Sequence, residues 1–224
     1  MQHLYADVTR LIRRHVDAVT PTGIDRVNVE YARWTRSHDG SLCIKRNDSL
    51  RTIPPKKWTN RLLEGDKNQS HPLRNLRLYS LLKALVTSKP LPRNSTLIVS
   101  SHSWLAQQQI WTWLQARQIN VFVFLHDLIP IQFPEYSAPG EKLIHEHRVN
   151  HTLRHSRGII VNSNCTASAV NEHAKLSGIT PPPILVAPLG NHTTPPAVIR
   201  QETHPFFVTL GTIEPRKNHL LLLT

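Results

Sequence analysis

Residues 121–125 read Val-Phe-Val-Phe-Leu, an uninterrupted apolar run followed at once by the polar pair His126-Asp127. A short run that is apolar on both faces is typical of a strand buried inside a parallel sheet. Similar runs occur at residues 96–100 (TLIVS) and 158–161 (GIIV). Short apolar strands that alternate with helices indicate a parallel sheet covered on both faces.

The rest of the chain alternates in the same way. The pattern predicts further strands at residues 3–8, 41–45 and 184–187, and helices at residues 24–36, 73–87, 104–117, 141–156 and 166–176. Residues 11–23 are interpreted as a polar connection and residues 46–72 as a loop. The sequence therefore predicts an α/β fold, a doubly wound, parallel-sheet, Rossmann-like domain.

A second domain is expected to begin near the end of the chain. Residues 192–204 contain two prolines and lack periodicity, which is typical of a linker, and they follow a first domain at residues 1–191. Residues 206–210 (FFVTL) then predict a new buried strand, followed by a turn and the start of an apolar helix. We expect residues 205–224 to be the truncated start of a second α/β domain.

Composition limits the class of protein. Hydrophobic residues make up 39% of the 224 residues and charged residues 19%, which fits a globular chain rather than a disordered one. The two cysteines, Cys43 and Cys165, are far apart, which excludes a disulfide scaffold or a cysteine-based zinc site as the organising feature. No apolar run approaches the ~20 residues of a membrane span, and the N-terminus is too charged for a secretory signal. We expect a cytoplasmic protein.

The positive charge is concentrated in one part of the sequence. The 27 Lys+Arg against 15 Asp+Glu give a net charge of +12, and residues 45–93 alone carry 12 basic and 3 acidic residues. Such a field attracts nucleic acid, anionic membranes or phosphorylated substrates. Because no nucleic-acid-binding motif is present, we expect no nucleic-acid partner. Two interpretations of this basic stretch remain. It is either a basic surface exposed to solvent or a surface that contacts the inner face of an anionic membrane.

Polar residues follow the buried strands at two places. His126 and Asp127 come directly after the strand at 121–125, where open α/β sheets bind ligands, and a histidine there can exchange hydrogen bonds or protons with a substrate hydroxyl. The alternative is a structural histidine bonded to a neighbouring loop. Asn162 and Ser163 follow residues 158–161 and suit either a ligand or the N-cap of the next helix, the cap being favoured.

Two further segments could bind phosphate. Gly23 and Arg26 lie at the start of the helix predicted at 24–36, where free N–H groups and a positive charge suit an anion, although a plain helix N-terminus is favoured on spacing alone. Arg216 and Lys217 lie beside a glycine-containing strand-to-helix turn. Two cations there suit a diphosphate, because in a simple helix N-terminus they would oppose the macrodipole.

Five segments, taken in chain order, resemble those of a known protein family. They are TGIDRVNVEYAR (22–33), HDLIPIQFPE (126–135), RGIIVNSNCTASAV (157–170), ILVAPLG (184–190) and FFVTLGTIEPRKNHLLLL (206–223). Together they resemble retaining GT-B glycosyltransferases of family 4, bacterial mannosyl- and glucosyltransferases of surface polysaccharides. HDLIP and GTIEPRKN are the specific motifs, and the resemblance is thin from residue 40 to 95.

The resemblance implies two Rossmann-like domains with the active site between them and no metal cofactor. The expected reaction transfers a hexose from a nucleotide-sugar to a lipid-linked or saccharide acceptor in envelope polysaccharide biosynthesis. The family's Glu-x7-Glu motif does not occur in the chain, so we expect it to be catalytically incomplete. The alternative is a non-catalytic domain, derived from such an enzyme, that binds a glycan or an anionic membrane.

The resemblance also assigns roles to the candidate residues. His126, with Asp127 beside it, would act at the transferred sugar. Gly23 would lie near the donor phosphates with Arg26, while Ser163 and Asn162 would line the cleft. Arg216 and Lys217 would neutralise the leaving diphosphate, which stabilises developing charge.

Overall fold

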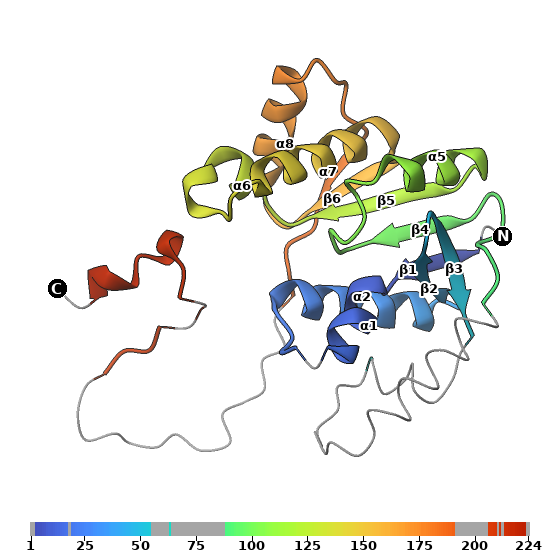
Figure 1. Cartoon of the computed structure of the whole chain (residues 1–224), viewed down its shortest axis with the longest axis horizontal. Coiled ribbons are helices and arrows are strands. Elements are labelled where there is room, and N and C mark those ends of the chain that lie inside the picture. Colours follow the sequence, from blue (N-terminus) through green and yellow to red (C-terminus); the bar gives the residue numbers. More distant parts are fainter. Residues whose placement is uncertain are drawn as a thin grey trace.

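A seven-stranded sheet forms the centre of the structure, a computed structural model in which residues 3–17, 19–54, 63, 88–190, 206–209, 211 and 213–222 are described (Figure 1). The strand order is β3-β2-β1-β4-β5-β6-β7. Every neighbouring pair is parallel except β2 and β3, which form an antiparallel hairpin. The strands are β1 (Leu4–Asp7), β2 (Ser41–Arg46), β3 (Ser49–Ile53), β4 (Thr96–Val99), β5 (Asn120–Leu125), β6 (Gly158–Val161) and β7 (Ile184–Val186).

Helices cover both faces of the sheet, which confirms the doubly wound, Rossmann-like α/β fold. The helices are α1 (Thr9–Val16), α2 (Gly23–Ser37), α5 (Gln108–Ala116), α6 (Ile129–Gln132), α7 (Glu141–His155) and α8 (Asn164–Leu176). Figure 1 shows α1 and α2 on one side of the sheet and α5, α7 and α8 on the other. The shorter 3-10 turns are η2 (Pro134–Tyr136), η3 (Pro215–Lys217) and η4 (His219–Leu222).

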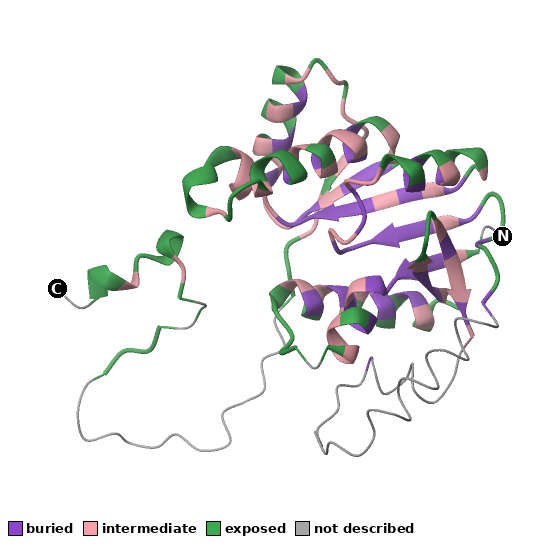
Figure 2. Ribbon diagram, in the orientation of Figure 1, coloured by how far each residue is buried: buried purple, intermediate pink, exposed green. Residues whose placement is uncertain are grey.

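Each face of the sheet has its own apolar core. Val121, Val123 and Leu125 of β5 pack into the larger cluster, while Phe124 points the other way, its ring 5.6 Å from that of Tyr31 on α2. This alternation explains why both faces of VFVFL are apolar, since each is covered by a helix layer. The central strands are accordingly buried almost throughout (Figure 2).

Strands are added on both sides of β1, and this arrangement indicates where a ligand can bind. From β1 the connection through α1 and α2 leads to β2 on one side, whereas β4, β5, β6 and β7 are added on the other. The gap between β1 and β4 is therefore the topological switch point. In open α/β sheets, ligands bind at the carboxyl ends of the strands beside this point.

Several predicted boundaries were wrong. Helix α1 covers residues 9–16, of which 11–16 were interpreted as part of a polar connection, and residues 49–53, interpreted as loop, form β3. Helix α5 begins at Gln108 rather than residue 104, because Trp104 and Leu105 are buried in the loop before it. The helix predicted at residues 73–87 and the linker at 192–204 lie outside the described residues, so the domain division stays a prediction.

The segment expected to begin a second domain differs from its prediction. Residues 206–209 are not in a strand, and Phe206, Phe207 and Val208 are all more than half exposed. The stretch predicted to start a helix forms the 3-10 turn η4 instead. Within the part of the chain that the structure describes, no helix is both long and apolar enough to cross a bilayer.

Candidate functional site at the switch point

Asp7, the last residue of β1, is fully buried at the switch point. Its carboxylate accepts hydrogen bonds from the Thr9 amide (3.1 Å), from the Thr9 hydroxyl, and from the indole nitrogen of Trp104 (2.9 Å). Burial raises the pKa of Asp7 because it disfavours the charged carboxylate, although these hydrogen bonds oppose the rise. Because Asp7 is fully buried and bonded to Thr9 and Trp104, it ties the end of β1 to the neighbouring loops.

Asn28 of α2 joins the two sides of the switch point. Its side-chain nitrogen donates to the Asp7 carbonyl (2.9 Å) and to the hydroxyl of Ser100 (2.7 Å). Ser100 is the first residue after β4. The residue is almost completely buried. One amide therefore fixes the start of the loop after β4 relative to β1, which keeps this part of the sheet edge rigid.

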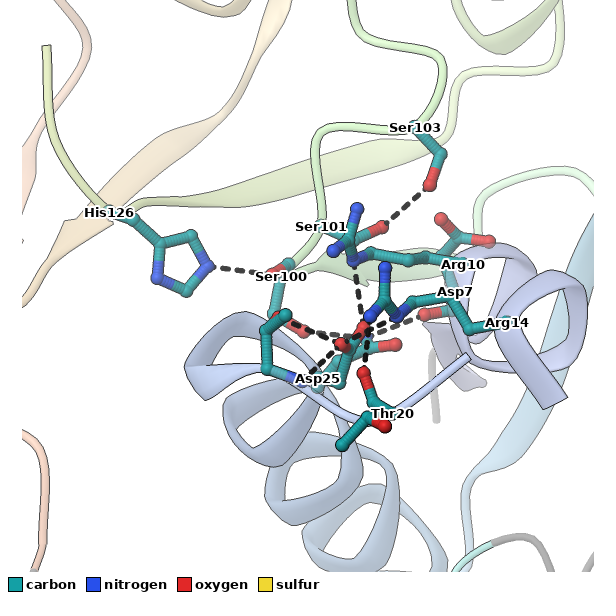
Figure 3. A network of polar contacts seen from close by, with 11 residues as sticks. Asp7, Arg10, Arg14, Thr20, Asp25, Ser100, Ser101, Ser103 and His126 are labelled. Carbon is teal, nitrogen blue, oxygen red and sulfur yellow. Dashed lines mark hydrogen bonds and ion pairs between the residues drawn. The ribbon is translucent and has the colours of Figure 1, made fainter. Parts of the chain in front are cut away.

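Asp25 organises the positively charged side of the site (Figure 3). Its carboxylate accepts from both the amide and the hydroxyl of Thr22 (2.7 Å each) and pairs with Arg10 (2.8 Å) and Arg14 (2.9 Å) of α1. Burial opposes ionisation of Asp25, but the hydrogen bonds from Thr22 and the charge of Arg10 outweigh it and lower the pKa. Asp25 is thus a charged anchor that draws α1 and α2 together.

Three histidines meet next to this anchor. The ring of His102 lies edge-on to those of His126 and His145, with 5.4 Å between centroids in both pairs. His126 Nε2 donates to the Ser100 carbonyl (2.9 Å) and His145 Nε2 to the Asp127 carbonyl (3.0 Å), whereas His102 Nε2 is buried without a partner. Burial lowers the pKa of all three rings, and nearby positive charge from Arg10 or Arg148 adds to the effect. The cluster is therefore neutral at pH ~7.

The structure places His126 at the carboxyl end of β5, as predicted, and gives it a structural contact. Its bond to Ser100 links the ends of β4 and β5, and Phe124 lies 4.7 Å from its ring. The proton on Nε2 leaves Nδ1 as the unprotonated acceptor of a neutral ring. Figure 3 shows His126 directed toward the Ser100 end of the site. This bond to the loop after β4 agrees with the structural alternative, and the role of His126 at a substrate stays a prediction.

The polar residues on the β5–β6 side serve the helices that follow them. Asp127 accepts a hydrogen bond from the amide of Ile129 (3.1 Å) at the start of α6. Ser163 is the N-cap of α8, accepting from the amide of Thr166 (3.1 Å), while Asn162 accepts from the Thr166 hydroxyl (2.8 Å). The cap interpretation of Ser163 is confirmed, and the assignment of Asn162 and Ser163 to a cleft stays a prediction.

The residues predicted to bind phosphate lie in two separate parts of the structure. Gly23 is the first residue of α2, two positions before Asp25, and is exposed, as is Arg26. Arg216 and Lys217 lie in η3, where Arg216 pairs with Glu214 at 2.5 Å. Figure 1 shows that turn apart from the sheet, so the structure does not bring these cations to Gly23.

Sequence reasoning missed the residues that give the switch point its charge. Arg14 escaped because residues 11–23 were interpreted as a connection, and Arg10, just before them, was assigned to no element. Their i,i+4 spacing on a helix was a usable signal. His102 escaped because it lies in a loop of small polar residues, and only the fold brings it to His126 and His145. Asp25 escaped because an acidic residue in the first turn of a helix is expected from the helix dipole alone.

A hollow among the described residues lies at the other edge of the sheet. Thr96, Asn120, Phe122 and Arg157 line it, and these residues stand at or before the amino ends of β4, β5 and β6. Ligands of open α/β sheets bind at the opposite edge. We therefore base the candidate site on the contacts at the carboxyl ends.

Comparisons of the chain with protein-family models, curated proteins and solved structures return no match. In the described ranges, no group of three or more His, Cys, Asp and Glu side chains is arranged to hold a metal ion.

Proposed function

We propose that the chain is the acceptor-side domain of a retaining glycosyltransferase that moves a hexose from a nucleotide-sugar to a lipid-linked or saccharide acceptor. The observation that carries the proposal is the position of His126 at the carboxyl end of β5, joined to Ser100 and within the electrostatic reach of Arg10. This is the edge at which Rossmann-like sheets bind their ligands. The motifs TGIDRV and HDLIP, which carry the family resemblance, lie at this same edge.

The residues present suit recognition of a sugar. A neutral imidazole with Nε2–H bonded to Ser100 offers Nδ1 as an acceptor for a sugar hydroxyl. Because burial lowers the pKa of His126, the ring keeps this acceptor through neutral pH. A neighbouring guanidinium stabilises negative charge that develops on a leaving phosphate. In this proposal Gly23, Arg26, Arg216 and Lys217 keep the donor-phosphate roles that the resemblance implies.

A transfer assay with His126→Ala tests the proposal. Labelled nucleotide-sugars are offered with membrane extract as acceptor, using the chain joined to whatever sequence follows it in its natural protein. We expect His126→Ala to lower turnover by about 10²-fold or more if the ring acts on the reacting sugar. It should also cost about 1 kcal/mol of stability, because the bond to Ser100 is lost.

His147→Ala is the matched control, since His147 is an exposed histidine on α7 and lies outside the three-ring cluster. It should leave turnover unchanged. Loss of stability in His126→Ala with normal turnover would contradict a role in transfer. Nucleotide-sugar or glycan binding without any transfer would favour the alternative of a non-catalytic binding domain.

A further inference from the structure

Two guanidinium groups share a single carboxylate at the switch point. Arg10 and Arg14 both pair with Asp25, so one positive charge is not compensated within this group. The other nearby carboxylate, Asp7, forms no ion pair with either arginine among the described residues. Its two oxygens accept hydrogen bonds from Thr9 and Trp104 instead. The anchor therefore carries a net attraction for an anion.

The two arginines use different parts of their side chains. Arg14 forms an ion pair with Asp25 through Nε, although Nε makes no hydrogen bond, and donates from Nη2 to the Thr20 carbonyl. Arg10 contacts Asp25 through Nε alone, and its two Nη groups make no recorded hydrogen bond with any described residue. The Arg10 side chain is 29% exposed, so this unused edge can be reached from solvent. Asp25 thus orients Arg10 in advance while leaving its outer donors unoccupied.

The surroundings of Arg10 complete the site. In the view of Figure 3, Arg10 extends from α1 toward the loop that holds Ser100, Ser101 and Ser103. Its charge reaches His102 and His126, contributing to their lowered pKa values. On the other side lies the start of α2, where a Cβ added to Gly23 would meet nothing within 4 Å. The positive end of this 15-residue helix therefore has open space at Gly23.

We propose that the outer edge of Arg10, backed by Arg14 and the start of α2, is a subsite for the phosphate group of a ligand. A planar fork with two parallel donors matches phosphate oxygens, and a helix N-terminus contributes amide donors. The subsite deepens the proposed function and rests on it for its place in the transfer reaction. It does not depend on that function for the ability to bind phosphate.

Calorimetric titration with inorganic phosphate and pyrophosphate tests the subsite directly. We expect Arg10→Gln to weaken binding about tenfold or more, because a charge-assisted fork is lost. Arg10→Lys should also weaken it, since lysine keeps the charge but not the paired donors. The matched control is Arg33→Gln, because Arg33 pairs one-to-one with Glu30 on α2. Equal affinity in wild type, Arg10→Gln and Arg33→Gln would overturn the proposal.

Asp25→Asn separates binding from structural support. Removing this charge leaves two unpaired arginines, so the phosphate affinity should rise by about threefold, from the loss of one competing charge at close range. The melting temperature should fall at the same time, because the anchor is weakened. If Asp25 had only a structural role, its substitution would lower both the phosphate affinity and the melting temperature. Reduced affinity in folded Asp25→Asn would therefore count against the subsite.

The source of the phosphate is distinguished by two sets of probes. One set contains uridine and guanosine diphosphates, and the other contains glucose 1-phosphate and a short-chain prenyl phosphate. Preference for the first set, lost in Arg10→Gln, assigns the subsite to the donor, and preference for the second assigns it to a phosphorylated acceptor. Nucleotide-sugar transfer that is unaffected by Arg10→Gln would refute the subsite but not the glycosyltransferase. Phosphate binding that depends on Arg10, without any sugar transfer, would support the subsite and refute the glycosyltransferase.

Discussion

Asp25 and Asp127 both lie at the carboxyl edge of the sheet, yet they are used in opposite ways. Asp127 accepts one hydrogen bond from Ile129, two residues along the chain. Asp25 receives Thr22 and two arginines from another helix, and it is almost completely buried. The β5–β6 side of the edge is thus built from local caps, whereas the β1–β4 side is built from contacts between distant segments.

This difference shows which side is suited to bind a charged ligand. On the β5–β6 side, one side-chain oxygen of each of Asn162, Ser163 and Asp127 accepts a hydrogen bond from the helix that follows it. On the β1–β4 side, Arg10 and His102 keep polar atoms without partners among the described residues. Unpaired polar groups at the edge of an open sheet are costly to the fold unless a ligand or water completes them. We therefore place the binding function at the switch point.

The largest expected effect comes from removing the anchor itself. Asp25→Ala deprives two arginines of their partner and removes the hydrogen bonds at the start of α2, so we expect a loss of about 3 kcal/mol of unfolding free energy. Asp127→Ala removes one cap of a four-residue helix and should cost about 1 kcal/mol or less. Urea unfolding of both variants measures the comparison. Equal losses would show that Asp25 is only a local cap.

The parts of the fold that the sequence predicts well are those set by apolar periodicity. Residues 96–100, 121–125 and 158–161 are buried strands because both helix layers demand apolar side chains there. Helix α1 was missed because few apolar residues, among them the buried Leu11 and Ile12, mark it among polar and basic ones. Strand β3 was missed although Asn47-Asp48, with Asn47 at φ 50°, is a typical two-residue hairpin turn.

The residues of the candidate site also fall into two groups, those that local sequence places and those that only the fold brings together. His126, Asp127 and Ser163 follow a strand directly, so position in the sequence is enough to place them at the edge. Nothing local shows that Arg10 meets Asp25 or that His102 meets His145, because these contacts join segments 15 and 43 residues apart. Partners of this kind depend on the crossover of the chain at the switch point, which periodicity does not specify.

The histidine cluster joins the two sides and should make their association sensitive to acid. The pKa values of His102, His126 and His145 lie below the ordinary 6.5, so the unfolded chain binds more protons than the folded one. The stability that the neutral rings allow is fully present above pH 6.5 and is lost as the pH falls below it. Each ring steepens this loss by up to about 1.4 kcal/mol per pH unit.

His102→Phe measures the contribution of the ring that contacts both of the others. Phenylalanine fills similar space and does not ionise, so we expect a flatter decline of unfolding free energy between pH ~7.5 and ~5. His147→Gln, which alters an exposed ring, should follow the wild-type curve. The charged neighbours named for this cluster, Arg10, Arg148 and Asp127, are unchanged in both variants. A His102→Phe curve parallel to wild type would show that the cluster does not govern acid stability.

The smallest effect on stability, and the sharpest separation of fold from binding, is expected at Gly23. The residue begins α2 without a left-handed φ, and an added Cβ would meet nothing within 4 Å. Gly23→Ala should therefore change the unfolding free energy by less than about 1 kcal/mol, in the stabilising direction. Phosphate affinity should nevertheless fall several-fold, because the new methyl group occupies the space through which an anion approaches the helix start. Paired urea unfolding and phosphate titration give both quantities. An unchanged affinity would mean that the ligand contacts Arg10 without reaching α2, and a large loss of stability would mean that the fold itself requires glycine here.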